Sequence, residues 1–202
     1  NPGGANTPMQ LAAYAEIAYE IYDQLRDAPK YLACPVSNGT LLAGVYRGFV
    51  NLYKRGKTSR IPHFIAGSSS NKNPIVSSYN KGLQHCEDLD PSKIRETEIN
   101  EPLINWHAID GDHALEGIRL TGGWASNASD KAMRTYSRLI REKEGLQVLP
   151  ASTAGLAALA LALLVVAGGV GWTIAMFTDS SDEVTAGSGV SDDSMQDDAV
   201  ED

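Results

Sequence analysis

The first third of the chain alternates between helix-like and strand-like hydrophobic patterns. Between residues 7 and 26, apolar side chains recur at three- and four-residue steps, which predicts one helix with an apolar face. The residues Tyr31–Pro35 are nearly all apolar, as in a buried strand in the interior of a parallel sheet. Residues 41–56 then predict a second helix, and Ile61–Ile65 predict a second buried strand. This order of strand, helix and strand predicts a right-handed parallel crossover.

The remainder of the chain continues this alternation with shorter elements. Residues 74–82, 111–121 and 130–144 predict helices, and Gln147–Leu149 predict a brief strand. The second predicted helix contains two glycines spaced four residues apart, Gly44 and Gly48. They indicate that this helix packs closely against the sheet. Together the elements predict an α/β protein built on a parallel sheet.

A short polar turn separates the first predicted strand from the helix behind it. Its residues supply hydroxyls, an amide and a glycine that can adopt φ > 0; they are Ser37, Asn38, Gly39 and Thr40. The first N–H groups of a helix have no intrahelical partner and lie at the positive end of its dipole. The turn therefore suits a phosphate, and a plain connecting turn is the alternative that spacing alone leaves open.

The net charge of −8 comes from the end of the chain. From Asp179 onward there are nine acidic residues and no basic one, which leaves 17 basic against 16 acidic residues elsewhere. We therefore expect an α/β domain over residues 1–178 and a disordered acidic tail over residues 179–202. The nearly neutral domain excludes the basic surface of a nucleic-acid-binding protein. Cys34 and Cys86 form no disulfide framework, and with no signal peptide before the first helix they favour the cytoplasm.

Residues Ala151–Phe177 contain no charged side chain. The run is long enough to span a bilayer, which takes roughly 20 apolar residues. Three glycines interrupt the run: Gly168, Gly169 and Gly171. The alternative is therefore a buried helix followed by a strand at Trp172–Phe177. The residues alone leave both interpretations open.

Two further polar groups bear on function. Residues of metal-ligand type lie within seven positions of one another, around a predicted helix start: His107, Asp110, Asp112 and His113. We expect surface and capping roles for them, with Asp112 at the N-cap or in the first turn of the 111–121 helix, and no metal site. The loop after the second strand either contacts a ligand or is an ordinary polar loop; its polar residues are Ser68, Ser69, Ser70 and Asn71.

Four motifs, in this order along the chain, resemble the C-terminal half of fold-type II pyridoxal-phosphate enzymes. They are PVSNGTLLAGVYRGF, then NEPLINW with GDHALEGIRLTGG, then the helix from SDKAM to EKEGL, and finally VLPASTAGLAAL. The similarity covers about residues 1–165 and points to threonine synthase and its relatives, within the group that includes tryptophan synthase β chains. It implies an open parallel sheet with helices on both faces, and it favours helix plus strand over a membrane span for residues 151–177.

The resemblance implies pyridoxal 5'-phosphate as the cofactor and assigns residues to it. In this family the strand-to-helix turn holds the cofactor phosphate, a role carried over to four residues: Ser37, Asn38, Gly39 and Thr40. A serine or threonine late in the chain faces the pyridine nitrogen, and Ser152 lies in the matching PAST segment. Thr178 is a second candidate, where the family's Thr-Gly-x-Gly is replaced by FTDSS.

The lysine that these enzymes use has no counterpart in this sequence. In the family, a lysine upstream of the turn forms a Schiff base with the cofactor aldehyde. The only lysine upstream here is Lys30, in a helix-to-strand loop, and Lys93 has the pattern of a solvated surface residue. We therefore predict no catalytic residue. The chain is a fragment, a partner of a separate N-terminal chain, or an inactive relic that binds the cofactor.

As a function, the resemblance implies a lyase of amino-acid metabolism that carries out β- or γ-elimination or replacement on an amino-acid substrate. A homodimer is compatible with the family. The competing hypothesis is not enzymatic: a tail-anchored or peripheral membrane protein, or an interaction protein, whose residues 151–177 insert into the bilayer. The resemblance disfavours this membrane alternative.

Overall fold

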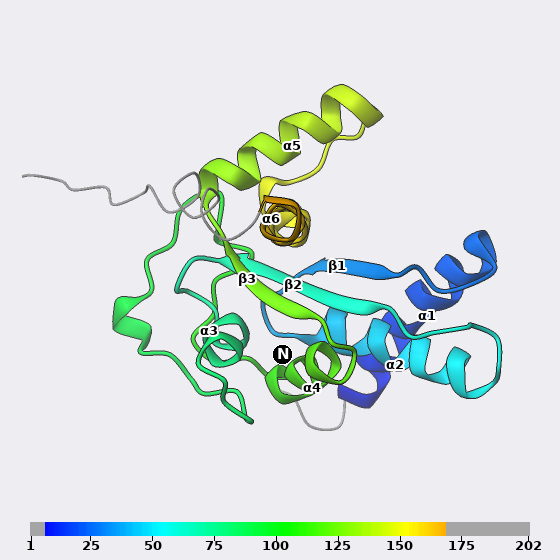
Figure 1. The fold of residues 1–202 in the computed structure, drawn as a ribbon. Helices are drawn as coiled ribbons and strands as arrows, with labels where there is room; N and C mark the ends of the chain where they lie inside the picture. The colour runs from blue at the N-terminus through cyan, green and yellow to red at the C-terminus, as the bar shows by residue number, and fades with distance from the viewer. Residues whose placement is uncertain (1–6, 169–202) are drawn as a thin grey trace, which may run out of the picture.

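The computed structural model of the chain describes residues 7–168, in which a three-stranded parallel sheet lies between helices (Figure 1). The strands, which lie in this order across the sheet, are β1 (Tyr31–Pro35), β2 (His63–Ser69) and β3 (Trp124–Ala128). The helices are α1 (Thr7–Leu25), α2 (Thr40–Lys54), α3 (Pro74–Asn80), α4 (Gly111–Leu120), α5 (Asp130–Glu144) and α6 (Ala154–Gly168). The described residues also form two short 3₁₀ turns: η2 (Pro91–Lys93) and η3 (Pro150–Thr153).

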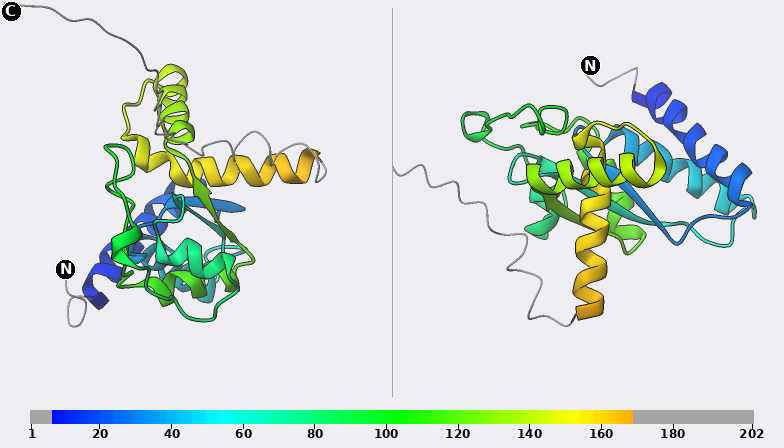
Figure 2. Two further views of the ribbon diagram at one scale, coloured as in Figure 1. Left: turned by 90° about the vertical axis from the view of Figure 1, so that its left-hand side faces the viewer. Right: turned by 90° about the horizontal axis from the view of Figure 1, so that it is seen from above.

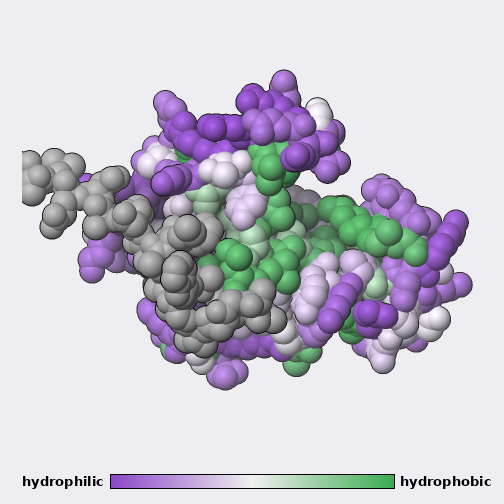
Figure 3. Space-filling model, turned by 45° about the horizontal axis from the view of Figure 1, so that its top comes forward, coloured by the Kyte–Doolittle hydropathy of each residue, from purple (hydrophilic) through white to green (hydrophobic). Residues whose placement is uncertain are grey.

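Helices cover both faces of the sheet, as predicted. Helices α1 to α4 lie on one side, whereas α6 crosses the other side with α5 beyond it (Figure 1). The two further views show that the end of α6 extends past the sheet (Figure 2). In the space-filling view, hydrophilic side chains gather over α5 and hydrophobic ones lie below it (Figure 3). The expected α/β fold with a parallel sheet is therefore confirmed.

The main hydrophobic core lies between the sheet and helices α2, α3 and α4. Phe64 of β2 is fully buried and meets Phe49 of α2, with ring centroids 6.5 Å apart. Burying one such side chain stabilises a fold by roughly 1.5–3 kcal/mol. A second, smaller core joins α5, η3 and the start of α6 around Met133. It holds the η3–α6 segment against the rest of the domain.

Two strand predictions differ from the structure over residues 7–168. β1 was expected in the interior of the sheet, but within residues 7–168 it pairs only with β2 and forms an edge. Residues 147–149 form no strand and lead instead into Pro150, the first residue of η3. β3 was not predicted, because its sequence WASNA lacks a hydrophobic run. It is a strand because it pairs in parallel with β2, with Trp124 opposite Ile65.

Gly44 and Gly48 allow a close approach, but to helix α1 rather than to the sheet. A Cβ atom on Gly44 would lie 2.5 Å from the Cβ of Tyr14, and one on Gly48 would lie 2.6 Å from the Cβ of Ala18. Real Cβ atoms do not come this close, so α1 can pack here only against bare backbone. The helix-to-helix contact explains both glycines.

The segment after β2 was expected to be a loop, and its first residues belong to the strand instead. Ser68 and Ser69 are buried in β2, which runs to Ser69. At Gly67 a Cβ atom would lie 1.9 Å from the carbonyl oxygen of Ala154, the first residue of α6. The chain thus brings η3 and α6 directly onto the backbone of β2. Neither buried serine is accessible to a ligand.

No helix within residues 7–168 is both long and apolar enough to cross a membrane. α6 is 15 residues long. The predicted strand at Trp172–Phe177, the candidate residue Thr178 and the acidic tail at 179–202 lie outside the described residues.

Replacing Gly67 by alanine should destabilise the fold by about 3 kcal/mol, because the added methyl group overlaps the backbone of α6. The control is Gly56→Ala, where nothing lies within 4 Å and only the left-handed conformation is strained, at about 1 kcal/mol. Urea unfolding of the two variants measures both costs. Equal costs would contradict the proposed packing of α6 on β2.

Asp27 should make stability depend on pH. Hydrogen bonds from the hydroxyl and N–H of Ser59, and from the N–H of Ala28, lower the pKa of Asp27 from 3.8 to about 2. A lowered pKa in the folded state stabilises the fold above about pH 4, and the contribution is lost as the pH falls towards 2. Asp27→Asn should therefore lose less stability than the wild type between pH 5 and pH 3 in urea unfolding. Ser59→Ala, which removes the hydroxyl that donates to Asp27, should weaken the same pH dependence.

Candidate functional site

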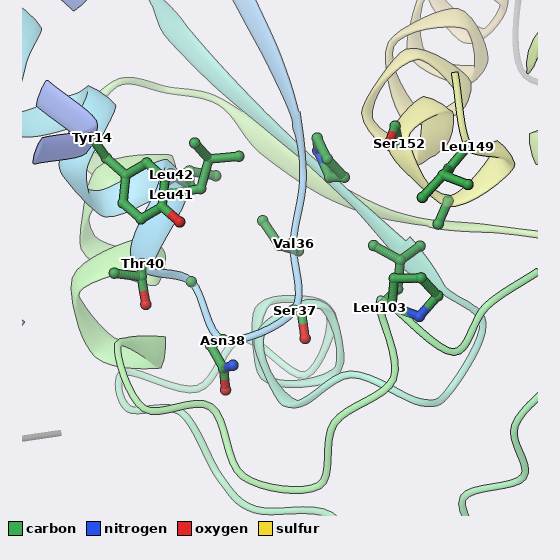
Figure 4. A pocket seen from close by; sticks show the side chains of 14 residues that line it. Tyr14, Val36, Ser37, Asn38, Thr40, Leu41, Leu42, Leu103, Leu149 and Ser152 are labelled. Carbon is green, nitrogen blue, oxygen red and sulfur yellow. The ribbon is translucent and has the colours of Figure 1, made fainter. Parts of the chain in front are cut away.

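A cavity of about 290 Å³ opens at the carboxyl end of β1 (Figure 4). It is lined by Tyr14, Pro35, Val36, Ser37, Asn38, Gly39, Thr40, Leu41, Leu42, Pro102, Leu103, Leu149, Ala151 and Ser152. The structure thus brings the four predicted turn residues and Ser152 to one cavity, with Tyr14 and Ser152 on opposite sides of it. Their role towards a cofactor stays a prediction.

The turn depends on Gly39. This residue has φ +89° and occupies the N-cap position of α2. A Cβ atom here would lie 2.8 Å from the carbonyl oxygen of Asp110 and 3.0 Å from side-chain carbons of Ala114 and Ile75. Both the left-handed backbone and the lack of space therefore require glycine.

Helix α2 begins without a side-chain cap. The first N–H group of this region that bonds to a described residue is that of Ala43, which donates to the carbonyl oxygen of Gly39 at 2.9 Å. The N–H groups of residues 38–41 donate to nothing in the part of the chain that the structure describes. By contrast, α3 and α5 are capped by the side chains of Asn73 and Ser129. The start of α2 is therefore left open for an acceptor, and an anion suits it best.

The Thr40 hydroxyl is already engaged. It donates to Oδ2 of the buried Asp110 at 2.6 Å. The N–H of Asp110 in turn donates to the carbonyl oxygen of Asn38 at 2.9 Å. Thr40 can therefore offer its N–H, but not its hydroxyl proton, to a ligand in the cavity.

Ser37 and Asn38 retain side-chain donors. The Asn38 Oδ1 atom accepts from Nδ2 of Asn105 at 2.6 Å, which leaves the Asn38 NH₂ group to face a ligand. The Ser37 hydroxyl bonds to no other described group. These two side chains and the N–H groups of residues 38–41 form a set of donors suited to a phosphate.

Ser152 lies in η3, opposite the turn. Its N–H donates to the carbonyl oxygen of Leu149 at 3.0 Å, whereas its side chain is exposed. The neighbouring Thr153 is buried and donates its hydroxyl to the carbonyl oxygen of Met133 at 3.0 Å. Of these two hydroxyls, only that of Ser152 can reach a molecule in the cavity.

Sequence reasoning missed two contributions to this site. Tyr14 belongs to the predicted helix over residues 7–26, for which only an apolar face was expected. It lines the cavity because Gly44 admits it against α2. Asn73 was overlooked although its position before Pro74, at a strand-to-helix turn, is the signal of a helix cap. It is buried directly behind the turn.

The other candidate groups fall outside the cavity. Asp112 lies in the first turn of α4, while Asp110 holds the N-cap position. Within residues 7–168 no three His, Cys, Asp or Glu side chains are arranged to hold a metal ion. Lys93 is 83% exposed, as expected for a surface residue. No lysine is among the described residues that line the cavity.

Neither cysteine offers a nucleophile at neutral pH. Burial raises the pKa of the Cys34 thiol to about 12. Burial likewise raises the pKa of Cys86 to about 11, and the nearby carboxylates of Asp112 and Asp88 add to the effect. Both side chains therefore remain thiols, which are poor nucleophiles.

Replacing Thr40 by valine should cost about 2 kcal/mol of stability, because the buried Asp110 loses its hydroxyl donor while the side-chain shape is kept. The matched control is Thr135→Val, whose hydroxyl bonds to the Lys131 carbonyl on the exposed face of α5. That change should cost about 0.5 kcal/mol or less. Chemical denaturation distinguishes the two, and equal losses would show that Asp110 does not depend on Thr40.

Comparison with known proteins connects this chain to a family. The family model described as pyridoxal-phosphate dependent enzyme matches residues 1–174. The threonine synthase of Methanocaldococcus jannaschii is 29% identical over 153 residues, which are 75% of this chain and 37% of that protein. The threonine synthase of Methanosarcina acetivorans is 28% identical with the same coverage. The chain thus spans less than two fifths of the length of these relatives.

Solved structures share the fold. Maize serine racemase superposes with a TM-score of 0.57 at 17% identity, over 74% of this chain and 42% of that chain. The processed form of threonine deaminase isoform 2 from Solanum lycopersicum gives a TM-score of 0.55 at 14% identity, over 73% of this chain and 39% of that chain. At this level of identity the likeness establishes the fold alone.

Proposed function

This chain belongs to the pyridoxal-phosphate dependent enzyme family, and from that membership we propose that it provides the phosphate-binding part of a threonine synthase-like active site. One observation carries the proposal: α2 starts at a left-handed glycine, without a side-chain cap, and its free N–H groups border a cavity. The residues present therefore suit the phosphate group of pyridoxal 5'-phosphate.

Each described group at the cavity then has a role. The N–H groups of residues 38–41, the Ser37 hydroxyl and the Asn38 amide would hold the phosphate. Ser152, across the cavity, would hydrogen-bond the pyridine nitrogen. Leu103 and Leu149 line the cavity with apolar side chains, which would exclude water from the ring.

The choice of serine at position 152 favours one kind of chemistry. When bound, the cofactor supplies the electron sink for elimination or replacement reactions on amino acids. A serine hydroxyl remains neutral and holds the ring nitrogen without giving it a lasting charge. A carboxylate would instead keep that nitrogen protonated. We therefore propose β- or γ-elimination or replacement on an amino-acid substrate.

The covalent anchor of the cofactor would come from outside these residues. The described lining of the cavity contains no lysine, and Lys30 lies at the opposite end of β1 from the turn. The matched threonine synthases are more than twice as long as this chain. We propose that a further segment, in the same or a separate polypeptide, carries the lysine.

Binding of pyridoxine 5'-phosphate to the full chain tests the phosphate site. This compound lacks the aldehyde and so cannot condense with surface lysines. Isothermal titration calorimetry should show it binding about tenfold or more tightly than unphosphorylated pyridoxine, on the scale of one charge-assisted hydrogen bond. Equal affinity for the two compounds would contradict the proposal.

A pair of glycine variants locates the site. Gly39→Ala should weaken binding of pyridoxine 5'-phosphate by about tenfold or more, because the left-handed conformation is strained and the methyl group meets Asp110. Gly56→Ala carries the same kind of strain far from the cavity and should leave the affinity unchanged. Loss of binding in both variants would mean that general destabilisation, rather than the turn, is responsible.

A further inference from the structure

The side chain of Asn73 lies on the interior side of the turn, and both its amide NH₂ group and its oxygen form hydrogen bonds there. It is 1% exposed. Its Nδ2, which carries two protons, lies within hydrogen-bond distance of three carbonyl oxygens: those of Ser37 at 2.9 Å, Val36 at 3.2 Å and Leu103 at 3.3 Å. Its Oδ1 accepts from the N–H groups of Ile75 and Val76, at 3.0 and 3.3 Å, and so caps α3. One neutral side chain thus joins the end of β1, the turn, the 102–103 wall of the cavity and a helix.

The bond to Ser37 determines where the next N–H points. In a planar trans peptide, the carbonyl oxygen of one residue and the N–H of the following residue point in opposite directions. When Asn73 draws the Ser37 carbonyl inward, the N–H of Asn38 is turned away from the protein interior. In the same way, the bond from the Asp110 N–H to the Asn38 carbonyl oxygen turns the N–H of Gly39 outward.

From this geometry we infer that Asn73 is a positioning residue for phosphate recognition: its amide orients the Asn38 N–H towards the cavity. The inference rests on the proposed phosphate site and adds a residue that does not line the cavity. A donor is needed at this position, because three carbonyl oxygens converge on it. The amide of asparagine is the group that supplies this donor while its oxygen caps α3.

Ser68 provides a matched control in the same buried region. Its hydroxyl donates to the Val36 carbonyl oxygen at 2.7 Å and approaches that of Leu103 at 3.5 Å. It shares two of the three carbonyls with Asn73 but does not bond to Ser37. Ser68→Ala therefore removes buried hydrogen bonds but keeps the bond from Asn73 to the Ser37 carbonyl, which fixes the Ser37–Asn38 peptide.

Two variants of Asn73 test the role. Asn73→Ser keeps a capping hydroxyl for α3 but is too short to reach the Ser37 carbonyl. Asn73→Leu keeps the approximate volume of the side chain and removes both the donor and the cap, and it serves if the serine variant does not fold. Circular dichroism and urea unfolding of each variant, and of Ser68→Ala, establish which are folded before any binding is compared.

The first measurement needs no ligand. Residual dipolar couplings of ¹⁵N-labelled full chain report the direction of each N–H bond. The coupling of Asn38 should change in the Asn73 variants and stay as in the wild type in Ser68→Ala. An unchanged Asn38 coupling in a folded Asn73 variant would overturn the inference.

The second measurement titrates the same proteins with pyridoxine 5'-phosphate. The Asn73 variants should bind about tenfold more weakly, whereas Ser68→Ala should stay within about twofold of the wild type, even where it is destabilised to a similar extent. If the Asn73 and Ser68 variants lose affinity for pyridoxine 5'-phosphate equally, Asn73 has only a structural role and the inference is overturned. If the wild type binds no pyridoxine 5'-phosphate, the proposed function fails, and the Asn38 coupling still decides whether Asn73 orients this amide.

Discussion

The site depends on backbone packing directly against backbone where η3 and α6 meet the sheet. Gly67 of β2 leaves room for the carbonyl of Ala154, and Gly155 of α6 rests against the backbone of Cys34 in β1. Only glycine permits both contacts. They fix the start of α6 over the carboxyl ends of β1 and β2, where the turn begins. Ser152, two residues before α6, is thereby brought to the same cavity as residues that precede it by more than a hundred positions.

The backbone of the turn is hydrogen-bonded on the side that faces the interior, and its N–H groups are without a described partner on the side that faces the cavity. Towards the interior, its carbonyl oxygens accept hydrogen bonds from Asn73 and from the N–H of Asp110, and Thr40 bonds to the Asp110 carboxylate. Towards the cavity, its N–H groups have no described partner. A segment tied down on one side keeps its shape while the other side is empty. Such preorganisation lowers the entropy cost of binding, and it is what a phosphate site requires.

Local patterns predicted the elements that carry their own hydrophobic signal, and contacts distant in sequence decided the rest. The bounds of β1 and the polar turn after it follow from the alternation of apolar and polar residues. Helix α2 was expected over residues 41–56 and runs from Thr40 to Lys54. β3 could not be predicted, because its polar sequence becomes a strand only by pairing with β2. Likewise, no spacing rule reveals that the hydroxyl of Thr40 is held by Asp110, seventy residues away. The resemblance to a family pointed to the turn and to Ser152, but the residues behind the turn emerge only from the fold.

Within residues 7–168, the outer edge of β1 is a place where a further strand can pair. Within the described residues its free side carries a row of backbone donors and acceptors with no strand beside them. Exposed rows of this kind are templates on which further strands add, including those of identical molecules. The five-residue length of β1 and the positive charge of Lys30 just before it limit such growth.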